Sequence, residues 1–352
     1  MLTKRIKRLT PYIPGEQPQD RKYIKLNTNE NPYPPSPEIG PYLKSFDIER
    51  LRLYPDPLFG MLREAISKRY NIDKAQVFVG NGSDEVLAFA FYAFFDSARG
   101  KLLFPEFSYS FYPVYCDFYD IEYRKIPLTG DFAIEINDYL GKDLSCGIVF
   151  PNPNAPTGIL LPLAKVTELL ERYPEDRVVV IDEAYIDFGG ESALPLIDRF
   201  KNLLVTRTFS KSMSLAALRL GFAMGNEDLV RALFAVKDSF NSYPADLLAQ
   251  QIGEIAIKDT GYYAAITKKI IESRTSLSGQ LEALGWEVLP SGANFIFAGK
   301  KGLSGETVYT RLKQEGILVR YFNIEGIKNF VRITIGTDEE IEALMTSVRT
   351  LF

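Results

Sequence analysis

One lysine stands where a covalent cofactor could be held. Lys211 follows the apolar run Leu203–Val205 and is flanked by Ser210 and Ser212. A lysine at the end of a buried strand can lose its proton and form an imine with an aldehyde. An ordinary exposed loop lysine is the commoner alternative. Arg219 follows eight positions later, and its guanidinium suits a phosphate, so the pattern favours pyridoxal phosphate.

Pyridoxal phosphate needs a carboxylate against its ring nitrogen and a donor to its phenolic oxygen. Asp182 follows the β-branched run Val178–Ile181, which is typical of a buried parallel strand. Because ligands of α/β sheets bind at the carboxyl ends of strands, Asp182 would face the ligand crevice. A helix N-cap is an equally good alternative. Tyr185 could donate to the phenolic oxygen, although a core tyrosine would also suit its position.

A glycine-rich turn is the candidate phosphate site. The run Gly80–Asp84 reads Gly-Asn-Gly-Ser-Asp and precedes an apolar helical pattern. Backbone N–H groups at a helix N-terminus attract anions, and Ser210 and Arg219 would complete the cradle. The turn alone is weakly specific, because many strand-to-helix turns use Gly and Ser.

Two further runs follow predicted strands. Phe107 comes after the strand-like residues 101–104 and could lie flat on an aromatic cofactor ring, or could be a core residue. The turn-forming run Asn152–Gly158 comes after the predicted strand 147–150 and places amides at the same sheet edge.

The elements that must position these residues alternate between strand and helix over residues 60–240. This alternation predicts an α/β fold, a three-layer and mostly parallel sheet with helices on both faces. We expect an arm and part of a small α+β domain over 1–50, a large domain over 51–269 and the small domain over 270–352. The predicted helices of the large domain cover 60–70, the stretch from the turn 80–85 to about 95, 107–119 and 163–172, and its predicted strands cover 77–79, 101–104, 147–150, 178–181, 203–205 and 220–224. Residues 244–284 are expected to be mostly helical, followed by strands over 286–289, 294–297, 317–319 and 330–334 and by helices near 304–314 and from about 338.

The composition excludes several kinds of chemistry. None of the 352 residues is histidine, which excludes serine triads, Cys–His dyads and most zinc sites, and we expect no metal. A net charge of −4 gives no reason to expect nucleic acid or a membrane as partner. No apolar run reaches the roughly 18 residues that span a bilayer. Residues 1–25 lack a signal-peptide core and Cys116 and Cys146 cannot form a disulfide framework, so we expect a cytoplasmic protein.

The order of these pieces carries a resemblance to a known family. The chain resembles the pyridoxal-phosphate-dependent aminotransferases of fold type I, and among them it is most similar to the histidinol-phosphate aminotransferases. The resemblance covers almost the whole chain. The motifs that carry it are Leu9–Tyr12, Leu26–Asn31, Tyr54–Asp56, Asn152–Gly158, Ile181–Tyr185, Arg207–Lys211 and Val331–Gly336.

The resemblance implies a role for each matching residue. Lys211 would carry the cofactor as an aldimine and then move a proton from the substrate α-carbon. Asp182 would pair with the pyridine nitrogen, and Tyr185 would donate to the phenolic oxygen. Tyr54 would reach the cofactor phosphate of a neighbouring subunit, which implies a homodimer. The other implied cofactor contacts are Gly82, Ser83, Asp84, Phe107, Thr208, Ser210 and Arg219. The implied substrate contacts are Tyr12, Asn29, Arg320 and Arg332.

One position departs from the family pattern. The residue before Pro156 is usually an asparagine that donates to the phenolic oxygen, but here it is Ala155. Either Asn154 takes that role through a shifted turn, or Tyr185 acts more alone. We expect Asn154 to take it.

The resemblance implies transamination with ping-pong kinetics. The expected reaction converts L-histidinol phosphate and 2-oxoglutarate to imidazole acetol phosphate and L-glutamate. A threonine-phosphate decarboxylase and an aromatic amino-acid aminotransferase are the alternatives with the same cofactor. A non-catalytic amino-acid sensor is a further alternative, but the presence of Lys211, Asp182 and Arg219 together argues against it.

Overall fold

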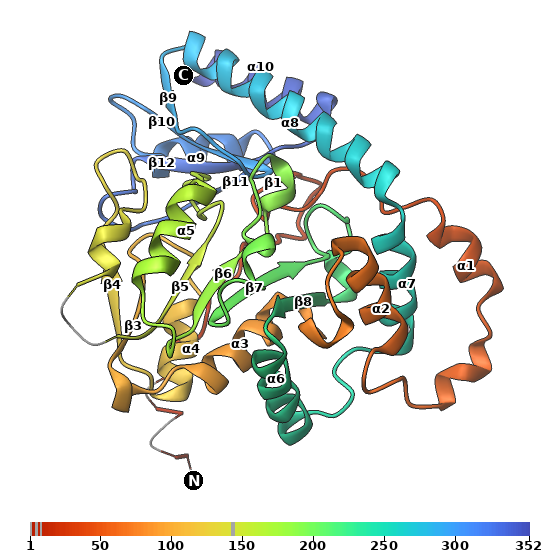
Figure 1. The fold of residues 1–352 in the computed structure, drawn as a ribbon. Coiled ribbons are helices and arrows are strands. Elements are labelled where there is room, and N and C mark those ends of the chain that lie inside the picture. The colour runs from red at the N-terminus through yellow and green to blue at the C-terminus, as the bar shows by residue number, and fades with distance from the viewer. Residues whose placement is uncertain (1, 4–5, 8, 142–144) are drawn as a thin grey trace.

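The computed structural model describes residues 2–3, 6–7, 9–141 and 145–352 and contains two β-sheets covered by helices (Figure 1). The large sheet has seven strands in the order β2-β8-β7-β6-β5-β3-β4. These strands are β2 Val77–Asn81, β3 Lys101–Pro105, β4 Tyr123–Ile126, β5 Ser145–Pro151, β6 Val179–Asp182, β7 Leu203–Thr208 and β8 Leu220–Gly225.

Side-chain alternation explains why the large sheet is covered on both faces. Val179 and Ile181 of β6 belong to one buried cluster, and Val180 between them belongs to the other. Helices α3 Gly82–Phe94, α4 Tyr112–Tyr119 and α6 Glu227–Phe240 supply the second cluster. Helices α2 Gly60–Tyr70, α5 Leu163–Arg172 and α7 Leu247–Lys258 supply the first. The predicted three-layer α/β fold is therefore confirmed.

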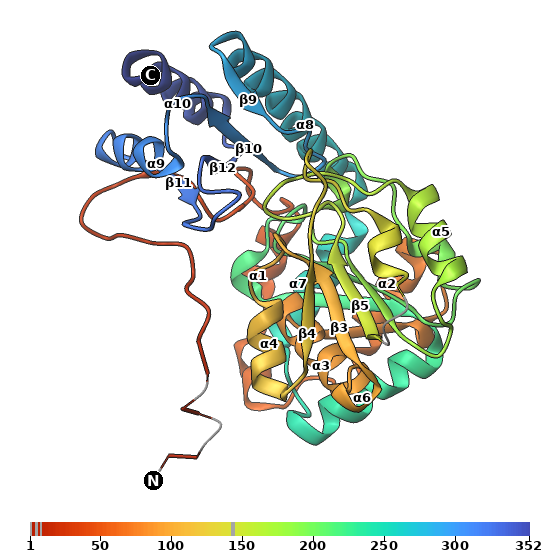
Figure 2. The same ribbon diagram turned by 90° about the vertical axis from the view of Figure 1, so that its left-hand side faces the viewer.

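The small sheet is built from both ends of the chain (Figure 2). Its order is β1-β11-β12-β10-β9, with β1 parallel to β11 and the other pairs antiparallel. The strands are β1 Ile24–Leu26, β9 Trp286–Val288, β10 Phe295–Lys300, β11 Ile317–Tyr321 and β12 Phe330–Thr334. The other helices are α1 Ile39–Ser45, α8 Thr260–Ala283, α9 Gly305–Gln314 and α10 Asp338–Leu351. The domain boundary predicted at 269–270 falls inside α8, so one continuous helix serves both units.

The strand directions bring several loops to one edge. Strands β3 to β7 are parallel, whereas β8 runs antiparallel to both β7 and β2. The carboxyl ends of β2, β6 and β7 therefore lie at the same edge, where β8 begins. The glycine turn, Asp182 and Lys211 follow these ends, as the sequence predicted from strand alternation.

Three local features differ from the sequence-based expectation. Strands β1 and β4 were not predicted, because three or four residues carry too little periodicity. The helix expected over 107–119 begins only at Tyr112.

Among the described residues, no helix is both long enough and apolar enough to cross a membrane.

Candidate active site

Two cavities adjoin where the loops after β6 and β7 meet the segment after β1. The inner cavity has a volume of about 180 Å³, and the outer cavity has a volume of about 220 Å³. The residues that line both are Thr28, Tyr109, Ala155, Tyr185 and Lys211. Because the lysine is shared, it can act on a group bound in either cavity.

Lys211 lies in the loop between β7 and β8. Its Nζ donates to the main-chain oxygen of Thr28 at 3.3 Å and stands 5.7 Å from the centre of the Tyr185 ring. The hydroxyl of the next residue, Ser212, donates to Asp187 at 2.5 Å. The loop is therefore tied down beside the lysine, while the amine faces both cavities.

Asp182 ends β6 and is buried at the inner cavity. Its carboxylate accepts hydrogen bonds from the Ala184 N–H at 3.2 Å, the Tyr112 hydroxyl at 3.2 Å and the Thr206 hydroxyl at 3.4 Å. All three donors are neutral. Burial raises the pKa of Asp182 from 3.8 to about 6, because a charge without a cation is costly in a dry site. A protonated ring nitrogen would supply that cation.

The glycine turn and Arg219 form a tight cradle at the N-terminus of α3. Gly82 has φ of +77°, and a Cβ there would lie 2.7 Å from the Arg219 guanidinium. A Cβ on Gly221 would lie 2.3 Å from the Ser83 amide nitrogen. Only glycine allows these approaches, which leave the first N–H groups of α3 and the arginine beside one cavity. Arg219 also donates to Asp84 at 2.8 Å.

Ser210 and Thr208 complete the wall of the inner cavity. The Arg219 guanidinium lies 3.5 Å from the Ser210 hydroxyl, and the Ser210 N–H donates to the Thr208 hydroxyl at 3.1 Å. The structure therefore brings together the residues that the sequence predicted for the phosphate.

In the described part of the chain, the Tyr185 hydroxyl donates to no protein group, so its proton can go to a ligand. The Asn29 side chain donates to the Tyr185 hydroxyl at 2.9 Å, so the tyrosine acts there as acceptor and can still donate. Asn29 has φ of +55° and is buried at the outer cavity, where it also contacts the Thr334 hydroxyl at 3.0 and 3.1 Å. The structure thus makes Asn29 a partner of Tyr185.

Phe107 does not line either cavity, contrary to its predicted place against the cofactor ring. Its ring packs beside Gly326 and Phe132 in a separate apolar cluster. Tyr109 lines both cavities instead, and its hydroxyl donates to Asp84 at 2.7 Å. The sequence offered no signal to choose between them, because aromatic residues crowd 107–112.

Asn154 is also outside the lining of both cavities, whereas Ala155 lines both. The Asn154 amide donates to the main-chain oxygen of Phe107 at 2.9 Å and to the Thr157 hydroxyl at 3.0 Å. The amide thus closes its own turn and does not point to the ligand. Among the two alternatives, the geometry favours Tyr185 acting without an asparagine.

Two arginines meet in the outer cavity. Arg320 of β11 and Arg332 of β12 are direct cross-strand partners. Arg332 donates to the main-chain oxygen of Asn27 at 3.1 Å, and burial lowers its pKa. Its Nε is buried and has no hydrogen-bond partner among the described residues. Arg320 donates to the main-chain oxygens of Ile13 and Pro14, both at 3.3 Å. Like charges opposite each other destabilise a sheet, so this pair suits a bound anion.

Two predicted residues come from the N-terminal segment. Tyr12 lines the outer cavity, and its ring lies 4.9 Å from that of Phe111. Tyr54 lies elsewhere, with 83% of its surface exposed, and stacks on Tyr243 at 4.6 Å. The structure therefore brings Tyr12 to the site and leaves Tyr54 on the surface.

The residues of the inner cavity fit pyridoxal phosphate. The cofactor has a phosphate, a basic ring nitrogen, a phenolic oxygen and an aldehyde. The cradle at α3, the buried carboxylate of Asp182, the free proton of Tyr185 and the amine of Lys211 match these groups in turn. The outer cavity then offers Arg320 and Arg332 to an anionic substrate.

The chain is similar in sequence to a known protein family and to individual proteins over nearly its whole length. The family model for aminotransferase class I and II matches residues 21–348. A histidinol-phosphate aminotransferase of Syntrophus aciditrophicus is 60% identical, and the match covers 100% of this chain and 98% of that protein. One from Chromohalobacter salexigens is 49% identical over 98% of this chain and 97% of its own length.

Solved structures show the same fold. The histidinol-phosphate aminotransferase of Sinorhizobium meliloti, in complex with pyridoxal-5'-phosphate, superposes with a TM-score of 0.88 at 22% identity, covering 100% of this chain and 98% of that one. L-threonine-O-3-phosphate decarboxylase of Porphyromonas gingivalis has a TM-score of 0.78 at 23% identity, covering 93% and 98%. The fold alone therefore does not separate these two reactions.

Proposed function

The chain belongs to the aminotransferase class I and II family, and we propose that it transfers the amino group of L-histidinol phosphate to 2-oxoglutarate at Lys211. It is a pyridoxal-phosphate-dependent enzyme. The observation that carries the substrate proposal is the cross-strand pair Arg320 and Arg332, which lies in the outer cavity beside Lys211. Two guanidinium groups fit a phosphate dianion.

When bound, the cofactor supplies an aldehyde carbon and an electron-withdrawing ring, which makes the C–H bond at the substrate α-carbon more acidic. With the cofactor bound, Lys211 Nζ would hold its aldehyde carbon. Once the substrate amine has released it, the Nζ would take the α-proton and deliver it to the former aldehyde carbon. Its reach to the Thr28 oxygen shows one position in which the amine can rest.

Two other side chains set the charge of the ring. Asp182 would hold a proton on the ring nitrogen, because its buried carboxylate accepts from neutral donors among the described residues. Tyr185 would donate to the phenolic oxygen, and the Asn29 amide orients the Tyr185 hydroxyl. Tyr109 lies where it can cover the face of the ring.

An amino-donor assay tests this proposal. The purified enzyme should form glutamate from L-histidinol phosphate and 2-oxoglutarate, with parallel double-reciprocal lines that indicate ping-pong kinetics. Lys211→Ala should abolish both half-reactions. Release of carbon dioxide from L-threonine phosphate without glutamate would contradict the proposal and identify a decarboxylase.

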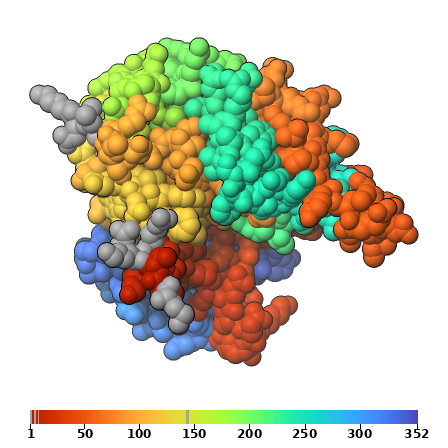
Figure 3. Space-filling model, turned by 90° about the horizontal axis from the view of Figure 1, so that it is seen from below, coloured from red at the N-terminus to blue at the C-terminus, as the bar shows by residue number. Residues whose placement is uncertain are grey.

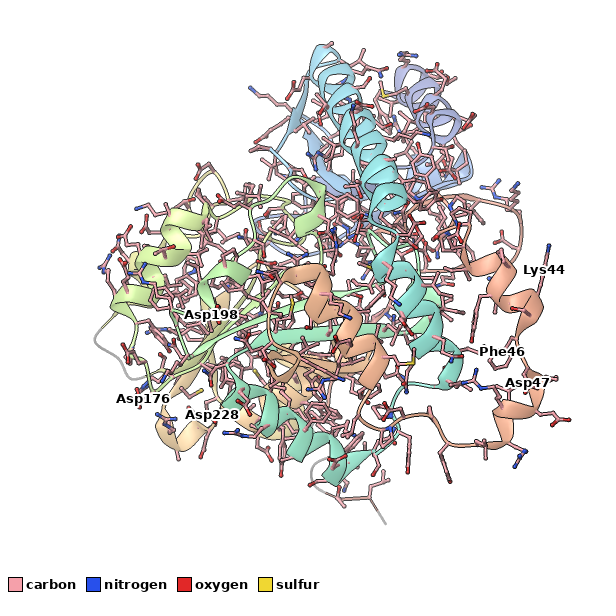
Figure 4. The ribbon with its side chains drawn as sticks, turned by 45° about the vertical axis from the view of Figure 1, so that its right-hand side comes forward. Lys44, Phe46, Asp47, Asp176, Asp198 and Asp228 are labelled. Carbon is pink, nitrogen blue, oxygen red and sulfur yellow. The ribbon has the colours of Figure 1, made fainter. Side chains whose placement is uncertain are left out.

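The enzyme acts as a homodimer in this proposal, with Tyr54 entering the neighbouring site. Exposed apolar residues gather on the segment that includes α1 and projects from the body (Figures 1 and 3). Figure 4 shows Lys44, Phe46 and Asp47 on this projection. The exposed apolar residues are Leu43, Ile48, Leu51, Leu53, Tyr54, Leu58 and Met61. A patch of this kind typically marks a protein interface.

Mixing two inactive variants tests the dimer. Tyr54→Ala and Lys211→Ala homodimers should each be impaired, because each site lacks one residue. Heterodimers formed by unfolding and refolding the mixture should regain one intact site. Sedimentation of the wild type at the mass of one chain, 39.8 kDa, would contradict the dimer.

We also place the enzyme in the cytoplasm. Cys116 and Cys146 are free thiols buried in the large sheet unit, which suits a reducing compartment. Fractionation of cells that produce the protein would test this location, and recovery from an oxidising compartment would contradict it.

A further inference from the structure

Residues Asn27–Asn31, the connecting segment, join the small sheet to the loop that carries Lys211. The segment directly follows β1, which pairs with β11 of the small sheet. Three of its residues are asparagines at alternate positions. Each of the three touches a different residue of the site described above.

The three asparagines contact, in chain order, an arginine of the outer cavity, a tyrosine shared by both cavities and the backbone of Lys211. The main-chain oxygen of Asn27 accepts from Arg332 at 3.1 Å, and the Asn29 side chain donates to Tyr185 at 2.9 Å. The Asn31 side chain donates to the main-chain oxygen of Lys211 at 3.0 Å. It also donates to the next carbonyl, that of residue 212, at 3.3 Å.

The connecting segment contacts Lys211 both at its backbone and at its side-chain amine. Asn31 binds the backbone carbonyl, and the Thr28 oxygen accepts from the amine at 3.3 Å. Asn31 is itself oriented, because its Oδ1 accepts from the Tyr33 N–H at 3.0 Å. Both polar atoms of the Asn31 side chain thus have partners, which fixes the orientation of the amide that binds the lysine backbone.

The large sheet holds the same loop from the opposite side. The Ser212 hydroxyl donates to Asp187 at 2.5 Å, and Asp187 accepts from Arg207 at 3.0 Å. Ser212 is therefore fixed by its side chain, but the carbonyl of Lys211 depends on Asn31 and on the Ser214 N–H at 3.3 Å. Removing the Asn31 amide would therefore leave the peptide bond between Lys211 and Ser212 with fewer hydrogen bonds to hold it in place.

We propose that Asn31 is a positioning residue for Lys211. Its amide fixes the lysine backbone, which limits the directions that the four-carbon side chain can take toward the inner cavity. The inference rests on the proposed function, in which Lys211 bonds with the cofactor. A lysine has high rotamer entropy, and a misplaced reacting atom slows a reaction strongly. The same contact links the position of Lys211 to the small sheet through β1.

The test compares two substitutions of Asn31 with a matched control. Asn31→Ala removes the amide, and Asn31→Asp keeps its size while placing oxygens against the two carbonyls. Asn202→Ala is the control, because the buried Asn202 amide also bridges two main-chain carbonyls, those of Pro174 at 3.2 Å and Arg177 at 2.9 Å. Asn202 lines neither cavity.

The measurement is the rate at which cofactor-free protein gains visible absorbance after pyridoxal phosphate is added. We expect both Asn31 variants to react about tenfold more slowly, as for the loss of one to two hydrogen bonds, and Asn202→Ala to react at the wild-type rate. Thermal unfolding of each cofactor-free protein checks that the folded fraction is the same. Should Asn31→Ala fail to fold, Asn31→Asp carries the comparison.

Two outcomes are distinguishable failures. If the wild type reacts and both Asn31 variants match Asn202→Ala in rate, Asn31 does not position Lys211 and the inference is overturned. If the wild type never gains the absorbance, the proposed function fails, and the inference falls with it.

Discussion

Asp182 and Glu183 are neighbours in the chain, yet they lie in opposite electrostatic settings. Asp182 ends β6 on the side of the cluster that contains Tyr112, where all of its donors are neutral. Glu183 accepts from Arg207 at 2.9 and 3.1 Å, from Ser192 at 2.7 Å and from the Ala193 N–H at 2.6 Å. Alternation along the strand sends the two side chains to opposite faces.

The difference separates a structural carboxylate from one kept for a ligand. A buried charge is stable when a counter-ion and hydrogen bonds surround it, as they surround Glu183. Asp182 has hydrogen bonds but no counter-ion among the described residues, so a cationic ligand would complete the compensation of its charge. The sequence assigned Asp182 to the ligand from its place at the strand end, whereas the counter-ion of Glu183 is seen only in the structure.

Removing the counter-ion of the structural carboxylate, Glu183, should have the largest effect on stability. Arg207→Met leaves Glu183 buried without its cation, because Arg207 and Glu183 side chains are only 8% and 0% exposed. We expect the free energy of unfolding to fall by about 3–5 kcal/mol, measured by urea denaturation of the cofactor-free protein. The double variant Glu183→Gln with Arg207→Met should recover most of that loss. Equal stability of the single and double variants would contradict the pairing.

Removing the charge of Asp182, the carboxylate kept for a ligand, should have the opposite effect and stabilise the cofactor-free protein. The folded pKa of Asp182, about 6, lies above its ordinary 3.8, so folding penalises the ionised form. That penalty is absent below pH 4 and complete above pH 6. Asp182→Asn should therefore stabilise the cofactor-free protein by about 3 kcal/mol at pH 8, but not at pH 4.

The activity of the same variant provides its control. Asp182→Asn should lose transamination by more than about a hundredfold, because no anion remains to hold the ring proton. A stable variant with wild-type turnover would show that Asp182 does not face the cofactor. Urea denaturation at two pH values and a glutamate assay give both results.

The comparison extends to cations. Arg332 is half-buried and has no carboxylate partner in the described part of the chain, whereas Arg207 has two. Arg332→Met should raise KM for the phosphate-bearing amino donor by roughly 30-fold, equivalent to about 2 kcal/mol. The exposed Arg349→Met is the matched control and should leave KM unchanged. An unchanged KM in Arg332→Met would place the substrate anion elsewhere.

The smallest effect should come from one neutral donor to Asp182. Tyr112→Phe removes a hydrogen bond that favours the ionised carboxylate, so the pKa of Asp182 should rise by about 0.7 unit, from about 1 kcal/mol. The pH dependence of unfolding of the cofactor-free protein should shift upward accordingly. Tyr139→Phe is the control, because the Tyr139 hydroxyl is buried without a partner in the described part of the chain. Equal curves for both variants would exclude a role for Tyr112.

Much of the fold and of the cofactor side could be predicted from the sequence. Continuous apolar runs such as Val178–Ile181 mark buried parallel strands, and a polar residue just after such a run must lie at the sheet edge. Asp182 and Lys211 were found by this local reasoning. The positions of Phe107 and Asn154 away from the cavities could not be predicted. Phe107 and Tyr109 are nearby aromatic residues that compete for one place, and the Asn154 amide is bound within its own turn.

The sequence by itself determined the family, the cofactor chemistry and the order of the motifs, because most of the motifs are strand ends with their own turns. Only the tertiary structure decided which residues meet across the two sheets. It placed Tyr109 at the cavities, set Arg320 opposite Arg332 and brought Asn31 to the backbone of Lys211. The physical reason is distance along the chain: periodicity and turn chemistry act over a few residues, whereas these contacts depend on how separate elements pack.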